Sequence, residues 1–267
     1  MHIIDNEKIK SILYEISKTK LLPHFKNLKS DQIKYKNNSE IVTSIDIEIE
    51  NSLKKILTQL IKNSNFIGEE IYTQKPEILD FYNKEQYCWT VDPIDGTSNY
   101  VKGKEYFAIM IALTFKSKII QSWIYKPITE EFMYSIYGKG TFLNNKKILN
   151  INYISISNAI GAISPKYWDK KLEDKIKILK NYFLEINSYG SIGCEYFDIA
   201  LGKRNFVILS KLSPWDHLPG VLIVREAGGC DSHFNNLKYI FNKQSKNLIV
   251  SNSKELNIEI INKLKEI

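Results

Sequence analysis

Residues 89–100, WTVDPIDGTSNY, constrain the fold of this chain more than any other segment. The β-branched and aromatic residues 87–91 predict the end of a buried strand. We expect the strand to stop at Asp92 and Pro93, because proline has no N–H to give to a sheet and holds the preceding residue extended. Asp92 and Asp95 then flank a proline-stiffened turn, and both carboxylates can point at one place.

The residues after this turn favour an anion beside a metal ion. Gly96 lets the backbone approach a ligand closely. Residues 97–99 can begin a helix, whose first N–H groups and dipole attract an anion. Clustered carboxylates next to such a site suit a divalent cation that holds a phosphate. A capped turn explains a single Asp and Gly, but the run D-P-I-D-G-T after a buried strand favours the metal interpretation.

This run resembles the first signature of the inositol monophosphatase family, the magnesium-dependent, lithium-sensitive sugar phosphatases, and the chain is similar to a bacterial-type member. Three further family elements occur in family order. Residues 42–46 resemble the V-T-x-x-D element, and residues 68–70 the G-E-E element. Trp215 and Asp216 resemble the second signature, W-D-x-A-A-G, although Leu218 and Pro219 replace Ala-Ala.

The resemblance implies the sugar phosphatase fold, an α+β chain layered as helices, sheet, helices, sheet and helices. It implies a single domain over residues 1–267, with an N-terminal lobe of about 1–147 and a C-terminal lobe of about 148–267. The N-terminal lobe would carry the metal motif and an antiparallel sheet. Residues 106–143 support that sheet, because they predict a meander rather than an alternating βαβ pattern. Homodimers are common in the family, and we carry that expectation over.

The resemblance also implies a metal site. One Mg²⁺ would be bound by Glu69, Asp92 and the Ile94 carbonyl, and a second by Asp92, Asp95 and Asp216. Two or three ions are expected in all, with inhibition by Li⁺. The chemistry agrees, because paired metal ions can neutralise a phosphate monoester, acidify a water and stabilise the leaving oxygen.

The same resemblance assigns the remaining roles. Glu69 with Thr97 would orient the attacking water, and Asp46 would lie near the metals as a third catalytic residue. By itself, Asp46 in the first turn of a helix is better explained by a favourable interaction with the helix dipole. The residues expected to contact the substrate or its phosphate are Asp95, Gly96, Thr97, Gly190, Ser191 and Asp216.

Several local features remain open at this stage. The family has a lysine in the loop before residue 42, and either Lys34 or Lys36 fits it. Residues 31–42 predict a polar loop leading into a short strand, and Ser44 predicts a cap for the next helix. Glu70 is a candidate for supporting the metal ligands. His217 is either a phosphate neighbour or a structural residue.

The expected activity is Mg²⁺-dependent hydrolysis of a small phosphorylated metabolite, such as inositol monophosphate, by metal-activated water. Fructose 1,6-bisphosphate, 3′-phosphoadenosine 5′-phosphate and histidinol phosphate are alternative substrates. In the family's inositol enzymes a Glu seven residues before the second-signature Asp contacts the inositol ring. That position is Leu209 here, which puts inositol phosphate itself in doubt.

Charge and cysteine content bound the remaining alternatives. The net charge of +7 and pI near 9.0 permit an RNA-associated regulatory role. A Lys-rich solvated surface is favoured instead, because no dense basic run with interleaved aromatics occurs.

The isolated cysteines suggest a reducing compartment. Residues 1–10 do not resemble a signal peptide, and no apolar stretch reaches the roughly 20 residues that span a bilayer. We therefore expect a cytoplasmic protein without a membrane partner.

Overall fold

The chain folds into alternating layers of helices and sheets, and the computed structural model describes residues 2–36, 40–149, 152–241 and 247–267. The α-helices in these residues are α1 (Asn6–Ile16), α2 (Ser44–Leu60), α3 (Glu69–Gln74), α4 (Thr97–Val101), α5 (Lys170–Leu179), α6 (Ile192–Ala200), α7 (Pro214–Glu226) and α8 (Lys254–Glu266).

The strands form a hairpin and two larger sheets. The hairpin pairs β1 (Ile33–Lys36) with β2 (Glu40–Thr43). The seven-stranded sheet has the order β3 (Asn65–Gly68), β4 (Tyr87–Asp95), β5 (Ala108–Phe115), β6 (Lys118–Lys126), β7 (Glu131–Ile136), β8 (Gly140–Leu143) and β9 (Lys146–Ile148). The five-stranded sheet has the order β11 (Glu185–Ile186), β10 (Ile160–Ile163), β12 (Phe206–Leu209), β14 (Leu248–Ser251) and β13 (Cys230–Ser232).

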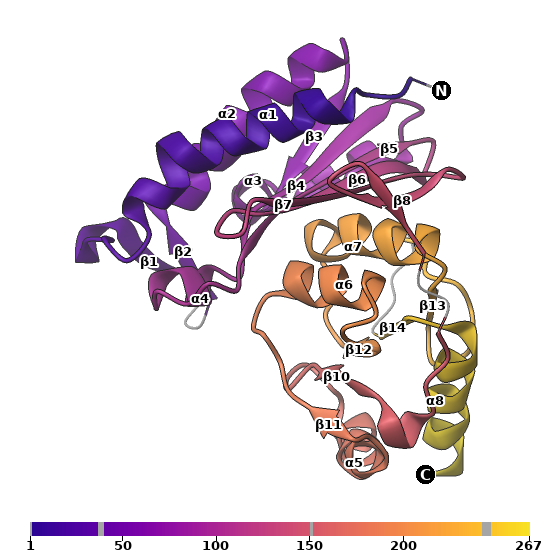
Figure 1. The fold of residues 1–267 in the computed structure, drawn as a ribbon. Helices are drawn as coiled ribbons and strands as arrows, with labels where there is room; N and C mark the ends of the chain where they lie inside the picture. Colours follow the sequence, from indigo (N-terminus) through magenta and orange to yellow (C-terminus); the bar gives the residue numbers. More distant parts are fainter. Residues whose placement is uncertain (1, 37–39, 150–151, 242–246) are drawn as a thin grey trace.

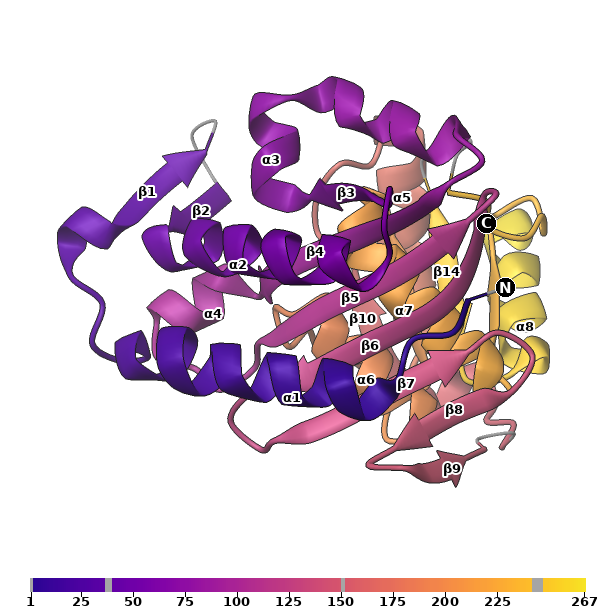
Figure 2. The ribbon, with the colours of Figure 1, turned by 90° about the horizontal axis from the view of Figure 1, so that it is seen from above.

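The layers follow the expected order of helices, sheet, helices, sheet and helices. Helices α1 and α2 lie across the outer face of the seven-stranded sheet (Figures 1 and 2). Helices α6 and α7 lie between the two sheets, and α5 and α8 cover the far side of the five-stranded sheet. From β4 to β9 every strand pairing is antiparallel, which confirms the meander. The division into two lobes near residue 147 stays a prediction.

Strand β5 shows how the sequence builds these layers. Side chains alternate between the two faces of a strand. Ile109, Ile111 and Leu113 pack in the core with α1 and α2. Ala108 and Met110, on the other face, pack in the core with α6 and α7. Because helices cover both faces, the strand is a continuous apolar run rather than an alternating one.

Three local predictions were wrong. Strand β4 does not stop at Pro93 but continues to Asp95, and its register with β5 shifts between Asp92 and Asp95. A bulge of this kind tolerates a proline that donates no hydrogen bond. Residues 31–42 contain a hairpin instead of a loop. The cap of α2 is Thr43, not Ser44, because the Thr43 hydroxyl accepts hydrogen bonds from the first turn.

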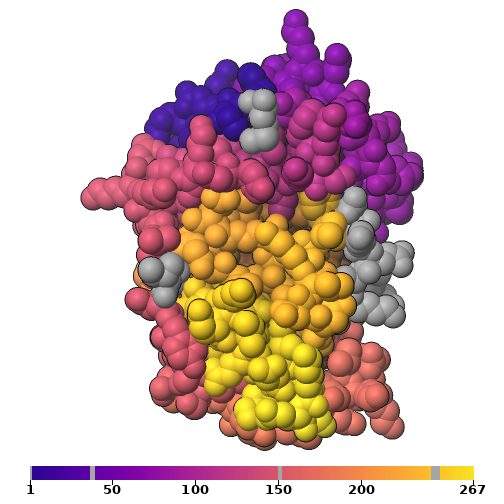
Figure 3. Space-filling model, turned by 90° about the vertical axis from the view of Figure 1, so that its right-hand side faces the viewer, coloured from indigo at the N-terminus to yellow at the C-terminus, as the bar shows by residue number. Residues whose placement is uncertain are grey.

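The N-terminal and C-terminal segments lie at different ends of one face of the molecule. On the face drawn in Figure 3, N-terminal residues (indigo and purple) lie at one end and C-terminal residues (yellow) toward the other. Cys88, Cys194 and Cys230 are free thiols. Among the described residues, no helix combines the length and the apolar character needed to cross a membrane.

Candidate active site

Three carboxylates from separate elements meet at one point. Strands β3 and β4 are parallel, so their carboxyl ends lie together. Glu69 follows β3 as the first residue of α3, and Asp92 lies near the end of β4. Asp216 lies in the first turn of α7. Glu69, Asp92 and Asp216 each offer a carboxylate oxygen, and these oxygens all lie within 4.8 Å of one another. That spacing suits ligands of a single cation.

Burial makes this cluster electrostatically unfavourable without a cation. Asp92 is only 2% exposed. The pKa of Asp92 is raised well above its usual range, by burial first and then by the negative charge of Glu69. The pKa of Asp216 is raised for the same two reasons. Because buried charges need a partner or a metal, a divalent cation is the natural counterpart of this cluster.

Asp95 lies beside the cluster and faces the start of α6. Its Oδ1 accepts a hydrogen bond from Ile192 N at 3.0 Å, and its Oδ2 accepts one from Gly193 N at 2.7 Å. The Ser191 hydroxyl also donates to Oδ2. Burial raises the pKa of Asp95 to about 6, against the effect of these hydrogen bonds. The structure thus brings an expected metal ligand and an expected substrate residue, Ser191, into direct contact.

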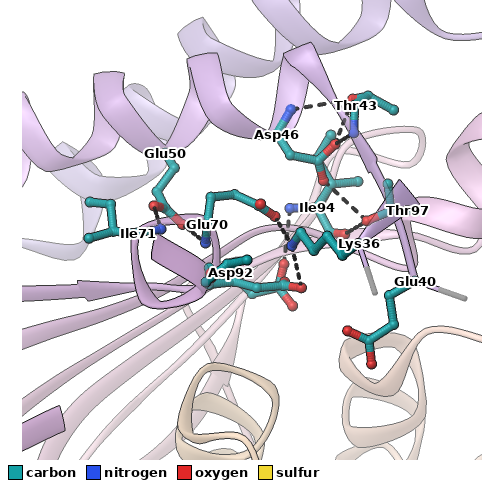
Figure 4. A network of polar contacts seen from close by, with 12 residues as sticks. Lys36, Glu40, Thr43, Asp46, Glu50, Glu70, Ile71, Asp92, Ile94 and Thr97 are labelled. Atoms are coloured by element: carbon teal, nitrogen blue, oxygen red, sulfur yellow. Dashed lines mark hydrogen bonds and ion pairs between the residues drawn. The ribbon is translucent and has the colours of Figure 1, made fainter. Parts of the chain in front are cut away.

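Asp46 and Thr97 form a second arm of the site (Figure 4). The Thr97 hydroxyl lies 3.1 Å from Asp46 Oδ1 and 2.9 Å from the Ile94 carbonyl. Thr43 donates to Asp46 Oδ2 from its N–H at 2.8 Å and from its hydroxyl at 2.5 Å. Burial raises the pKa of Asp46 to about 6. Asp46 therefore both caps α2 and positions the Thr97 hydroxyl.

Lys36, rather than Lys34, is the hairpin lysine that reaches the site. Its Nζ lies 3.1 Å from Glu69 Oε1 and 2.6 Å from Glu70 Oε1 (Figure 4). Burial alone would lower the pKa of Lys36, but the charges of Glu69 and Glu70 raise it. Lys34 is exposed. Glu70 contacts the site through Lys36, as a supporting residue would.

The sequence analysis missed Glu50, which fixes the start of α3. Its two carboxylate oxygens accept hydrogen bonds from Glu70 N and Ile71 N, both at 2.8 Å (Figure 4). Burial raises the pKa of Glu50 to about 7. A signal was available, because Glu50 is one turn after Asp46 and lies on the same face of an amphipathic helix.

Lys36→Met is expected to lower turnover roughly 10- to 100-fold, the range typical of residues that support metal ligands. The variant removes the ion pair that holds Glu69 in place, and it leaves Glu70 with no such partner. Lys34→Met is the matched control, because it removes an exposed lysine two residues away. Steady-state kinetics at saturating Mg²⁺ measure both variants. Equal rates for the two would mean that Lys36 plays no part in positioning Glu69.

The carboxylates open into a cavity of about 860 Å³. Gly96 borders it with φ of 89°, and a Cβ there would lie 2.9 Å from the Tyr106 carbonyl, so a glycine is needed. Asn99, another residue that the sequence analysis missed, donates from Nδ2 to the carbonyls of Tyr106 and Tyr189, both at 2.7 Å. The cavity is also lined by Lys36, Glu40, Glu69, Asp92, Asp95, Thr97, Gly190, Lys211 and Asp216.

His217 occupies a structural position. It is buried, and its Nδ1 lies 3.0 Å from the Tyr196 hydroxyl. Its Nε2 lies 2.8 Å from the Lys211 carbonyl, which can only accept, so Nε2 carries the proton. Burial lowers the pKa of His217 to about 4. A neutral ring held at both nitrogens favours the structural interpretation.

A buried carboxylate cluster that suits a divalent cation, in a layered α+β fold, is the arrangement expected of a metal-dependent phosphatase. The family model described as the inositol monophosphatase family matches residues 5–267. The chain therefore belongs to the inositol monophosphatase family. Members of this family are metal-dependent phosphatases, and the protein is a phosphoric monoester hydrolase of this kind.

Individual relatives and solved structures are similar to this chain. An inositol monophosphatase of Dictyostelium discoideum is 30% identical over 209 residues, covering 76% of this chain and 75% of that protein. The Nus factor SuhB of Vibrio cholerae is 31% identical over 212 residues, covering 78% and 77%. A solved IMPase/NADP phosphatase, complexed with Mg²⁺ and phosphate, has a TM-score of 0.79 at 20% identity and covers 96% of this chain and 93% of that chain.

Proposed function

We propose that this protein hydrolyses a small phosphorylated metabolite with Mg²⁺ held by Glu69, Asp92 and Asp216. The observation that carries the proposal is the convergence of these three carboxylates within 4.8 Å. They face a cavity of about 860 Å³, which is large enough for a small metabolite. The solved relative that holds Mg²⁺ and phosphate supports the same pairing of metal and ligand.

Each residue of the site then has a role in hydrolysis. Bound Mg²⁺ would neutralise the phosphate and make a water acidic enough to attack. The Ile94 carbonyl and Asp95 would complete the oxygen ligands, and two or three ions are expected in all. Thr97, positioned by Asp46, orients the attacking water together with Glu69.

The substrate is held mainly by backbone groups. The N–H groups of Gly96 and Thr97, which border the cavity, would hold the phosphate. Gly190, which also borders the cavity, contacts the alcohol part of the substrate. Ser191 contributes through Asp95, to which its hydroxyl already donates. We also carry over the homodimer of the family, which light scattering of the purified protein measures.

Mg²⁺ is expected to stabilise the protein more at pH 8 than at pH 5.5. The carboxyl pKa values of Asp46 and Glu50 are raised to about 6 and about 7, above their unfolded values of roughly 4. The metal-free fold therefore holds protons that the unfolded chain has lost. This contribution to stability is complete below about pH 4 and is lost as the pH rises through about 7.

The pKa values of Asp92 and Asp216 are raised as well, so protons on these two carboxyls also stabilise the metal-free fold at low pH. Mg²⁺ competes with these protons for the carboxylates, so its stabilising effect should be larger at pH 8 than at pH 5.5. Thermal denaturation with and without Mg²⁺, at matched ionic strength, measures the effect. A Mg²⁺ effect that is equal at both pH values would contradict a metal site made of these carboxylates.

Phosphate release over a substrate panel tests the proposed function. The panel contains inositol 1-phosphate, fructose 1,6-bisphosphate, 3′-phosphoadenosine 5′-phosphate and histidinol phosphate, each with Mg²⁺ and with a chelator. Release from at least one of them should require Mg²⁺ and should be inhibited by Li⁺. Inositol 1-phosphate is expected to be a poor substrate, because Leu209 replaces a carboxylate that would contact its hydroxyls. Absence of release from every member, with Mg²⁺ shown to be bound, would reject the proposal.

A second candidate function is favoured by one comparison. The relative from Vibrio cholerae is named a Nus factor, and the net charge of this chain is +7. An RNA-associated role predicts RNA binding that survives Asp92→Asn and falls steeply as salt is added. A filter-binding titration with RNA at two salt concentrations measures it.

A further inference from the structure

The mouth of the cavity carries an ion pair that the hydrolytic roles do not use. Lys211 lies between β12 and α7, and Glu40 is the first residue of β2. Lys211 Nζ lies 2.6 Å from Glu40 Oε1, and both residues line the cavity. The lysine thus adds a second positive charge to the cavity lining, besides the hairpin lysine that supports Glu69.

The backbone around Lys211 is anchored. Its carbonyl accepts a hydrogen bond from the buried ring of His217 at 2.8 Å. The neighbouring Ser210 hydroxyl donates to the Lys166 carbonyl at 2.5 Å. The Tyr167 ring lies 5.7 Å from Lys211 Nζ. These contacts fix where the ammonium group can reach, which is what a specificity residue requires.

The ion pair itself is easily exchanged. The side chains of Lys211 and Glu40 are 47% and 46% exposed. Exposed ion pairs contribute little, because water screens both partners. Lys36 differs, because its side chain is only 9% exposed and two carboxylates hold it. Between these two lysines of the cavity lining, Lys211 is therefore the one that can change partners when an anion arrives.

Leu209, two residues before Lys211, stands where the resemblance places an acid that contacts inositol. Leu209 is the last residue of β12 and lines an adjoining cavity of about 190 Å³. Gly190 borders both cavities. The part of the substrate that leaves would therefore meet Lys211, and position 209 offers it no carboxylate. A carboxylate would select hydroxyl groups at this place, whereas a lysine selects an anion.

We propose that Lys211 selects substrates that carry a second phosphate on the alcohol that leaves. This inference rests on the proposed phosphomonoesterase function. The second phosphate takes the place of Glu40 on the Lys211 ammonium, while the phosphate to be cleaved lies at the carboxylate cluster. A phosphate dianion carries more charge than one carboxylate and offers more acceptor oxygens, so the exchange is favourable.

The test compares matched substrates that differ only in the second phosphate. The pairs are fructose 1,6-bisphosphate with fructose 1-phosphate, and 3′-phosphoadenosine 5′-phosphate with 3′-AMP. In the wild-type protein the ratio of kcat/KM should favour the bisphosphate in at least one pair. Lys211→Met should lower that ratio about 10-fold, mainly through KM, as loss of one charge-assisted hydrogen bond does. Lys211→Arg should restore most of it, and Glu40→Gln should raise it.

The control is Lys166→Met, which removes an exposed lysine on the adjacent segment and should leave the ratio unchanged. If the wild-type protein releases phosphate but shows no bisphosphate preference, or if Lys211→Met keeps the preference, the role of Lys211 is rejected and the proposed function stands. If Mg²⁺ supports no release from any of the four compounds or from the wider panel, the proposed function itself is rejected.

Discussion

Asp92→Asn is expected to lower Mg²⁺-dependent phosphate release at least about 10³-fold. Asp92 is the most deeply buried member of the carboxylate cluster, and the family resemblance makes it a ligand of two of the ions. An amide has nearly the same shape, but it lacks the charge that holds a divalent cation. Loss of roughly 4 kcal/mol of transition-state stabilisation corresponds to this change in rate.

The same substitution should leave the fold intact. In the metal-free protein the pKa of Asp92 is raised, mainly by burial and then by the negative charge of Glu69. Because this shift favours the neutral carboxyl in the metal-free protein, a neutral amide replaces it at little cost, and the melting temperature without Mg²⁺ should stay equal or rise. Asp31→Asn is the matched control, because it changes an exposed aspartate outside the site. A wild-type rate of phosphate release from Asp92→Asn would show that this carboxylate cluster is not the catalytic site.

Gly220→Ala is expected to destabilise the protein by about 3 kcal/mol or more, at the upper end for an overpacked core. Helix α7 lies between the two sheets, and Gly220 faces α6. A Cβ at Gly220 would lie 1.9 Å from Cδ2 of Tyr196, a ring that is fully buried. The ring cannot easily move, because its hydroxyl lies 3.0 Å from His217 Nδ1. The helices would have to separate, which also displaces Asp216.

Thermal denaturation measures this effect, and a drop of about 6–12 °C is expected for a chain of this size. The double variant with Tyr196→Ala separates the clash from other effects of the methyl group. In that background Gly220→Ala should cost much less, because the space of the ring is free. A melting temperature unchanged by Gly220→Ala alone would show that α6 and α7 do not pack as closely as described here.

The sequence predicted the parts of the fold and site that depend on local pattern. The apolar run of β5 identifies a buried strand, and Asp92 lies in a specific motif. The motifs of Glu69 and Asp216 become informative only in combination with it. The motifs also indicate a shared location. Asp92 is expected near the end of a strand, and Glu69 and Asp216 at the starts of helices, so all three can direct a carboxylate at the same edge of the fold. The structure brings those three residues together.

The rest depends on contacts that are distant in the sequence. Strands β10 and β13 are only four and three residues long, and they exist through pairing with β12 and β14. Asp95 turns toward Ser191, 96 residues later, and Lys211 meets Glu40 across 171 residues. Neither contact can be recognised from a periodic pattern in the amino-acid sequence. The bulge at Pro93 was missed because the proline rule applies to regular strands.

The location of bound metal tests the central claim most directly. Crystals grown with Mn²⁺ in place of Mg²⁺ would show each ion by its anomalous scattering. The account predicts a peak about 2 Å from carboxylate oxygens of Glu69, Asp92 and Asp216. Peaks only at other places, with these three side chains ordered and free of metal, would contradict it.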